Sequence, residues 1–204
     1  MLKVLNLYSG IGGNRKLWKD VEVTAIENNP EIAKIYQDFF PNDKVIVTDA
    51  HQYLLENYKE FDFIWSSPPC QSHSRARFWG FGSGKMKAVY PDLKLYEEII
   101  FLMHYCKCKW VVENVNPFYE PLIIARKIGR HLFWANFHIP GFKSKDADIN
   151  RGNSNEWQEL HGFDISGYKL TSRRDKVLRS CVHPETGLHI FNCAFSKTKQ
   201  LSLV

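Results

Sequence analysis

The chain has 204 residues, of which 44% are apolar and 24% charged, and this ordinary globular composition excludes a disordered or fibrous protein. Its length predicts a single domain over residues 1–204. Lys and Arg number 27 against 22 Asp and Glu, and the resulting formal net charge of +5 permits a polyanionic partner without requiring one.

Cysteine usage and apolar runs indicate the setting of the protein. The five cysteines are an odd number whose spacing matches no disulfide framework, zinc motif or thioredoxin motif, so we expect a reduced, cytoplasmic protein. No apolar run approaches the roughly 20 residues that cross a bilayer, and Met1 leads straight into a strand-like segment. The histidines are scattered without metal-ligand spacing. We therefore expect no membrane segment and no metal.

Strand-like and helix-like segments alternate along the first half of the chain. Short apolar segments predict strands at residues 3–8, 21–26, 45–47, 61–65 and 110–112. Helical patterns lie between them, at residues 14–19, 30–39, 50–58 and 93–106. Asn29 before Pro30 marks one helix start as an N-cap followed by proline at N1. This alternation predicts an α/β fold, with a mostly parallel sheet and helices on both faces.

The pattern weakens after Asn116. Residues 117–128 fit a helix or a loop, and residues 131–139 fit strands. Residues 143–156 are polar and irregular.

Three predicted strands end in residues that suit a nucleoside cofactor, and ligands of open parallel sheets bind beyond the carboxyl ends of the strands. The first runs into Ser9-Gly10-Ile11-Gly12-Gly13, where glycine lets a ligand approach the backbone, although a plain tight turn fits equally well. The second ends at Glu27, which could accept two ribose hydroxyls or be a solvated acid at a helix start. The third ends at Asp49, which could accept an adenine amine or cap the next helix. No Walker lysine follows the glycines, which disfavours a triphosphate.

The fourth and fifth predicted strands end in a candidate nucleophile and a candidate acid. Ser67-Pro68-Pro69-Cys70-Gln71 places an exposed cysteine in a loop that two prolines fix at the mouth of the sheet, where its thiolate could attack a substrate. Glu113-Asn114 follows the fifth strand, and burial there could raise the pKa of the Glu113 carboxyl so that it donates a proton. Both groups face the same predicted cleft.

In this order, the motifs resemble those of the DNA cytosine-5 methyltransferase family. Residues 7–13 resemble its first motif, Glu27-Asn28 its second and Asp49 its third. Ser67-Pro68-Pro69-Cys70-Gln71 resembles its Pro-Cys-Gln loop, and Glu113-Asn114-Val115 resembles its Glu-Asn-Val motif. Residues 126–130 lie where the family has Gln-x-Arg-x-Arg, and residues 160–184 resemble its closing segments.

The resemblance implies a Rossmann-like methyltransferase fold that uses S-adenosylmethionine to methylate C5 of a cytosine flipped out of double-stranded DNA. It also implies a bacterial or phage setting, in which methylation shields DNA from restriction. The catalytic residues that it implies are Cys70, which attacks C6, Glu113, which protonates N3, and Arg130, which contacts O2. The implied cofactor-binding residues are Tyr8, Ser9, Gly10, Gly12, Gly13, Glu27, Asn28, Asp49 and Pro69. The implied substrate-binding residues are Gln71, Ser72, Arg75, Arg77, Asn114, Arg173 and Arg174.

Two basic segments outside the motifs suit a nucleic-acid partner. Residues 71–85 combine three cations with aromatic residues and glycines, which fits a mobile lid that touches phosphate and fills the space of a flipped base, or a basic surface loop. The second segment carries Arg173, Arg174, Lys176 and Arg179, which could face phosphate or solvent.

Three departures from the family pattern limit what carries over. Arg126 and Ile128 replace the expected glutamine and first arginine, so only Arg130 transfers. Arg179-Ser180 replaces a Gly-Asn pair that lies beside the cofactor in the family. Residues 138–158 form a reduced target-recognition region, too short for the usual domain that reads bases. We therefore expect a monomer with short or relaxed sequence specificity, or with a partner protein that supplies the specificity.

Two alternatives stay open at this point. A branch of the same family methylates tRNA with the same cysteine and glutamate, so the substrate could be RNA. A non-catalytic relative would bind nucleic acid or S-adenosylmethionine without turnover, and the intact Cys70, Glu113 and Arg130 argue against it.

Overall fold

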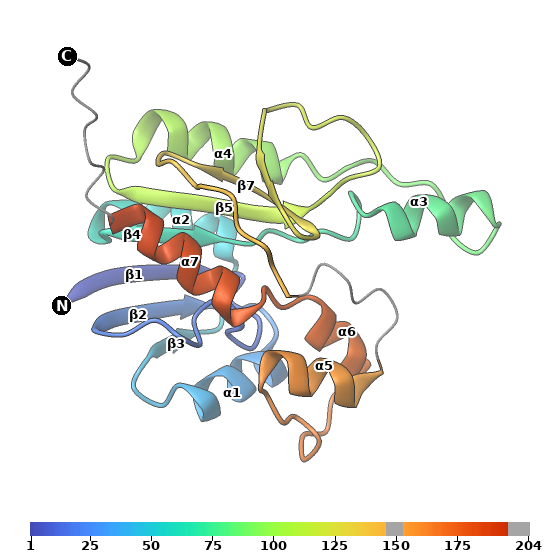
Figure 1. The fold of residues 1–204 in the computed structure, drawn as a ribbon, viewed down its shortest axis with the longest axis horizontal. Coiled ribbons are helices and arrows are strands. Elements are labelled where there is room, and N and C mark those ends of the chain that lie inside the picture. The colour runs from blue at the N-terminus through green and yellow to red at the C-terminus, as the bar shows by residue number, and fades with distance from the viewer. Residues whose placement is uncertain (146–152, 196–204) are drawn as a thin grey trace.

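The computed structural model describes residues 1–145 and 153–195, and within them a seven-stranded sheet has the order β3-β2-β1-β4-β5-β7-β6 (Figure 1). The strands are β1 (Leu2–Leu7), β2 (Val21–Ile26), β3 (Lys44–Ile46), β4 (Phe63–Ser66), β5 (Lys109–Val115), β6 (Arg126–Ile128) and β7 (His131–Ala135). Strands β1 to β5 pair in parallel, and β7 runs antiparallel to both β5 and β6. The expected mostly parallel sheet is confirmed.

Helices cover both faces of this sheet, as expected. They are α1 (Pro30–Phe39), α2 (Ala50–Asn57), α3 (Arg75–Gly82), α4 (Lys94–Tyr105), α5 (Ser154–His161), α6 (Arg174–Arg179) and α7 (Pro184–Phe195), with a short 3₁₀ turn, η1 (Tyr58–Glu60). One face packs on α2 and α4, and the other packs on α7 (Figure 1). Because both faces are covered, the central strands are continuous apolar runs, and every residue of β4 is buried.

A third apolar cluster holds the C-terminal helices beside the end of the sheet. Ile35 of α1, Trp157 of α5 and Leu178 of α6 are all buried in this cluster. The cluster therefore positions α6 next to the carboxyl ends of the parallel strands (Figure 1).

The start of α1 forms as its sequence predicts. The side chain of Asn29 accepts hydrogen bonds from the backbone N–H groups of Glu31, at 2.9 Å, and of Ile32, and Pro30 occupies the first helical position. This cap fixes the direction in which the chain leaves β2, and so fixes the position of Glu27.

The helix expected at residues 14–19 is wrong, since this segment forms a series of turns. Gly13 packs so closely that a Cβ there would lie 2.5 Å from the carbonyl oxygen of Val182. The amide of Asn14 donates a 2.8 Å hydrogen bond to the side chain of Asn6. Backbone hydrogen bonds in the segment span three residues instead of four. These contacts with distant parts of the chain outweigh the local helical pattern.

Three further boundaries refine the sequence interpretation. Strand β5 continues to Val115, so Glu113 and Asn114 lie inside the strand instead of after it. The segment 117–128 is mostly loop and ends in β6. Residues 146–152 of the expected reduced target-recognition region lie outside the described residues. Across the described ranges, every helix is too short or too polar to cross a bilayer.

Candidate active site

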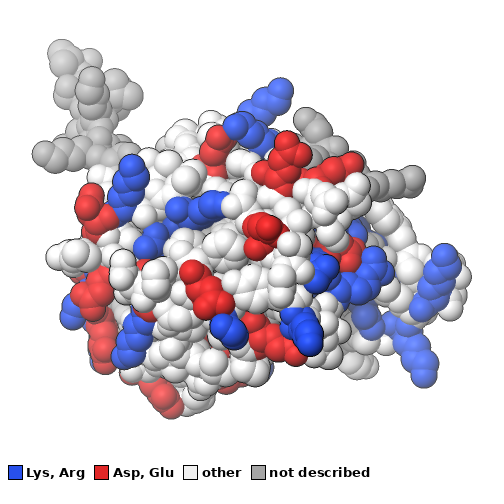
Figure 2. Space-filling model, turned by 90° about the horizontal axis from the view of Figure 1, so that it is seen from below, with Lys and Arg blue, Asp and Glu red and all other residues white. Residues whose placement is uncertain are grey.

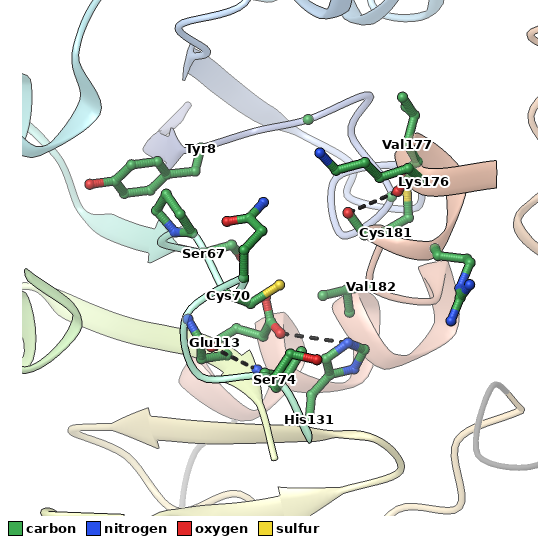
Figure 3. Close-up of a pocket in the computed structure, with 18 of the residues that line it drawn as sticks. Tyr8, Ser67, Cys70, Ser74, Glu113, His131, Lys176, Val177, Cys181 and Val182 are labelled. Carbon is green, nitrogen blue, oxygen red and sulfur yellow. Dashed lines mark hydrogen bonds and ion pairs between the residues drawn. The ribbon is translucent and has the colours of Figure 1, made fainter. Parts of the chain in front are cut away.

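A pocket of about 600 Å³ opens at the carboxyl ends of the parallel strands (Figure 3). The loops after β1, β2 and β4 line it, together with the end of β5, the turn before β7, and α6 with the residues that follow it. The expected site residues that line it are Tyr8, Ser9, Gly10, Gly13, Glu27, Pro69, Cys70, Gln71, Arg77, Glu113, Asn114, Arg130 and Arg173. Residues from strands far apart in the sequence therefore meet in one cavity.

The glycine-containing loop and Glu27 are locked together at one end of this pocket. One carboxylate oxygen of Glu27 accepts the backbone N–H of Gly10 at 3.1 Å, and the other accepts that of Asn29 at 2.9 Å. Burial raises the pKa of Glu27, while these hydrogen bonds act in the opposite direction. The carboxylate keeps free lone pairs for a ligand, because each oxygen can accept more than one hydrogen bond.

The same end of the pocket fits a nucleoside cofactor. Gly10 has a φ of +54°, and a Cβ built on it would meet nothing within 4 Å, so its backbone is open to a ligand. The hydroxyl of Ser9 is buried without a hydrogen-bond partner among the described residues. A buried hydroxyl of this kind usually has a partner, and a polar ligand beside the loop would supply one.

Three residues expected at the cofactor do not line the described pocket. A Cβ on Gly12 would lie 2.3 Å from the ring of Phe40, so this glycine serves packing inside the fold. The carboxylate of Asp49 caps α2 by accepting the N–H of Gln52 at 2.8 Å. Asn28 also lies outside the lining residues. The capping alternative for Asp49 is therefore observed, and the contact of these residues with a cofactor stays a prediction.

Cys70 lies near the middle of the pocket, half-buried instead of exposed as expected. The amide of Asn114 donates a 2.9 Å hydrogen bond to the carbonyl of Pro68, which ties the cysteine loop to β5. Burial raises the pKa of the Cys70 thiol to about 11, and the charge of Glu113 adds to this effect, whereas Arg130 acts against it. The thiol is therefore protonated at neutral pH in the free protein.

Glu113 lies beside Cys70 and is nearly fully buried (Figure 3). Its carboxylate is 3.6 Å from Nε2 of His131, the first residue of β7. No sequence pattern distinguishes His131 from the other histidines, because its contact with Glu113 depends on the antiparallel pairing of β5 with β7. His131 is the main site residue that the motifs missed.

Arg130 reaches the same pocket from the turn between β6 and β7. Its guanidinium donates a 3.0 Å hydrogen bond to the carbonyl of Arg179 and lies 5.0 Å from the ring centre of Trp157. These contacts join the turn to α6 and α5, and they hold the guanidinium of Arg130 in place at the pocket.

The residues expected to bind substrate divide into two groups. Gln71, Arg77, Asn114 and Arg173 line the pocket. The others lie outside its lining: Ser72 accepts the N–H of Asp92, Arg75 donates to the carbonyl of Pro117, and Arg174 donates to that of Ser166. Lys176, Cys181 and Val182, which belong to the segment that resembles the family's closing segments, also line the pocket.

Positive charge gathers at this end of the molecule. Figure 2 shows Lys and Arg side chains concentrated at the right-hand end of the lower face, which is the end where α3 and α6 lie in Figure 1. Within the described ranges, no three His, Cys, Asp or Glu side chains come together in a group that could hold a metal ion.

Comparisons with known proteins agree with the motifs. The C-5 cytosine-specific DNA methylase family matches residues 2–121. A tRNA (cytosine(38)-C(5))-methyltransferase from Spodoptera frugiperda is 34% identical over 80 residues, or 36% of this chain and 24% of the relative. The human protein of the same name is 33% identical over 81 residues, or 36% of this chain and 21% of the relative. The matched segment thus spans under a quarter of these relatives.

Solved structures were matched as well. A mutant of Spodoptera frugiperda DNMT2 is 28% identical, with a TM-score of 0.42 over 58% of this chain and 37% of that one. A putative DNA modification methyltransferase from an Escherichia coli prophage is 19% identical, with a TM-score of 0.41 over 59% of this chain and 34% of that one.

The family match includes the glycine loop, Glu27, Cys70 and Glu113, and covers more than half of the 204 residues. The cofactor of such enzymes, and of this chain, is S-adenosylmethionine. The pocket and the family match thus lead to the same conclusion: the chain belongs to the C-5 cytosine-specific DNA methylase family.

Proposed function

We propose that this protein methylates C5 of cytosine in double-stranded DNA, with short or relaxed sequence specificity. The observation that carries the proposal is that Cys70 and Glu113 share one pocket with the glycine loop and Glu27. A nucleophile and an acid in the same pocket as a nucleoside cradle suit a reaction between a base and a nucleoside cofactor.

In the proposed mechanism, the Cys70 thiol releases its proton to water, and Sγ forms a bond to C6 of cytosine. The electron pair of the C5=C6 bond moves to C4–C5, the C4=N3 pair moves to N3, and Glu113 supplies the proton that N3 takes. Arg130 stabilises negative charge that develops at O2. S-adenosylmethionine supplies the methyl group that C5 then takes. Water takes the proton from C5, the Cys70 thiolate departs and the C5=C6 bond forms again, while the N3 proton returns to Glu113.

A cytosine inside a duplex is out of reach of Cys70, so the base has to leave the helix. The segment 71–91 contains four cations and no acid, and Phe78, Trp79 and Phe81 on α3 are 51%, 68% and 52% exposed. Exposed rings beside a basic pocket can fill the gap in the base stack while cations hold the backbone. We therefore assign α3 and its flanking residues to the DNA-facing side.

Short or relaxed specificity follows from the length of the region that would read bases. Only residues 138–158 correspond to the target-recognition region, which leaves few side chains for the major groove. Bisulfite sequencing of methylated random DNA tests this directly. Unaided recognition of a site of about six base pairs would contradict it.

RNA is the second candidate substrate, and a specific observation favours it: the curated relatives named above are tRNA methyltransferases. Exposed aromatic rings on α3 suit an unpaired RNA base as well as a flipped DNA base.

Radiolabelled methyl transfer separates the two substrates. We expect label from S-adenosylmethionine in duplex DNA, at C5 of cytosine, and none after Cys70→Ala, although that variant should still bind the cofactor. Label in tRNA alone would establish the RNA alternative, and label in neither would reject both.

A duplex that carries 5-fluorocytosine tests the mechanism itself. Fluorine at C5 cannot leave as a proton, so the Cys70–C6 bond should persist and be found by peptide mapping. A trapped complex that maps to another residue would reject Cys70 as the nucleophile.

A further inference from the structure

Glu113 and His131 form a buried pair in the wall of the pocket. The carboxylate oxygen of Glu113 lies 3.6 Å from Nε2 of His131, and Glu113 is 6% exposed and His131 4%. Glu113 pairs with Phe133 and Val115 pairs with His131 across the antiparallel strands β5 and β7. The side chains of Glu113 and His131 are therefore diagonal neighbours on one face of the sheet.

Burial restricts how many protons this pair carries. Without any proton, the pair would leave a carboxylate charge in a poorly solvated place, which is costly. With two protons, it would add an imidazolium to a wall that is already basic. The other titratable and charged groups that line this pocket are Tyr8, Glu27, Cys70, Arg77, Arg130, Arg173, Asp175, Lys176, Arg179 and Cys181. One proton on the pair is the state that avoids both costs.

We propose that His131 and Glu113 act as a dyad that shares one proton, and that His131 is a positioning residue which supplies Glu113 with the proton that N3 of cytosine takes. The inference rests on the proposed function and deepens it. As Cys70 bonds to C6, the proton passes from Glu113 to N3, and the resulting carboxylate holds the N3–H. The dyad regains its proton when N3 gives it back at the end of the cycle.

Two substitutions of His131 separate holding Glu113 in place from sharing a proton with it. His131→Phe keeps the ring shape and removes both nitrogens. His131→Gln places an amide nitrogen near the position of Nε2, so it can hold the carboxylate but cannot titrate. His183→Phe is the matched control, because His183 is as buried as His131 (4%) and lies outside the pocket lining.

We expect His131→Phe to lower kcat by at least about 100-fold and to change KM for DNA by less than about threefold. The exchange of the C5 hydrogen of cytosine for deuterium, measured without a methyl donor, should fall by the same factor, because it also needs addition at C6. His131→Gln should recover part of kcat. In the pH profile of kcat for His131→Gln, the alkaline limb should move to lower pH by about one pH unit or more, because a lone carboxyl loses its proton at a lower pH than an imidazole.

An unchanged kcat and alkaline limb in both variants would overturn the dyad. The dyad would also be overturned if His131→Phe affected only thermal stability or KM. It would be overturned too if the control His183→Phe lowered kcat as much as His131→Phe does. If wild type shows neither transfer nor exchange, the proposed function fails, and NMR then decides on the dyad alone. The titration midpoint of the His131 ring should fall by about one pH unit or more in Glu113→Gln. An equal midpoint overturns the dyad.

Discussion

The phenol of Tyr8 donates a 2.5 Å hydrogen bond to the carboxylate of Glu98, which lies 90 residues further along the chain. Glu98 is 1% exposed and also accepts a 2.6 Å hydrogen bond from the hydroxyl of Ser66. Tyr8 follows β1 and opens the glycine loop, and Ser66 ends β4 just before the cysteine loop. One buried carboxylate on α4 therefore ties together the two loops that carry the proposed cofactor site and the nucleophile.

Replacement of this carboxylate should cost stability. In Glu98→Leu, the hydroxyls of Tyr8 and Ser66 lose their acceptor inside the protein, so we expect the free energy of unfolding to fall by about 3 kcal/mol. Urea denaturation at neutral pH measures the loss. The neighbouring Glu97, whose side chain is 62% exposed, provides the control Glu97→Leu, with an expected change within about 0.5 kcal/mol. Equal losses in both variants would show that the network does not stabilise the fold.

The same network makes stability depend on pH through His51. Nδ1 of His51 lies 3.0 Å from the carboxylate of Glu98, and this hydrogen bond raises the pKa of His51. A raised folded-state pKa contributes stability that is fully present below the unfolded value of about 6.5 and is lost as pH rises through the folded value. The stability difference between wild type and His51→Gln should therefore shrink as pH rises from about 5.5 to about 8.5. Urea midpoints across this range test it, and a difference that grows with pH would contradict it.

The reactivity of Cys70 should follow its raised pKa. Burial raises that pKa to about 11, so alkylation of Cys70 by iodoacetamide should be slow at neutral pH and should speed up until the pH approaches 11. Arg130→Leu should slow the reaction at a given pH, because the cation favours the thiolate. Mass spectrometry of the Cys70 peptide gives the rates.

A control for these charge effects lies on the neighbouring strand. Arg126 of β6 does not line the pocket, so Arg126→Leu should leave the alkylation rate of Cys70 unchanged. A rate as slow as that of Arg130→Leu would mean that net charge, and not the position of Arg130, controls the thiol.

Much of the site could be predicted from sequence because its signals are local. Gly10, Glu27 and Cys70 each follow an apolar strand within four residues, and parallel strands bring such ends to one edge of a sheet. The cap at Asn29 was predictable for the same reason, since the residues that make it lie within four positions.

What the sequence could not indicate depends on contacts between distant segments. The pairing of β5 with β7 brings His131 to Glu113, and no local pattern encodes that register. The turns at residues 14–19 arise because Gly13 is pressed against Val182, which lies far along the chain. Asp49 fitted a cap and a ligand equally well, and the geometry shows the cap.

Gly10 and Gly13 of the same loop allow an effect on stability to be separated from an effect on cofactor binding. A Cβ on Gly10 would meet nothing within 4 Å, whereas one on Gly13 would lie 2.5 Å from the backbone oxygen of Val182. Gly10→Ala should therefore cost only about 1–2 kcal/mol, from its positive φ of +54°. Gly13→Ala should cost at least as much, up to about 3 kcal/mol, because the backbone has to move. Urea denaturation compares the two.

Cofactor binding should show a different pattern from stability. The new methyl group of Gly10→Ala would project into the space where we propose that S-adenosylmethionine approaches the loop, so its Kd should rise by more than about tenfold, measured by calorimetry at a temperature where the variant is folded. Wild-type affinity in Gly10→Ala would mean that the cofactor does not use this loop. A loss of affinity in Gly10→Ala with a loss of stability of only about 1–2 kcal/mol would instead place the backbone of Gly10 at the ligand, because the open space around its Cβ leaves no protein contact to account for the loss of affinity.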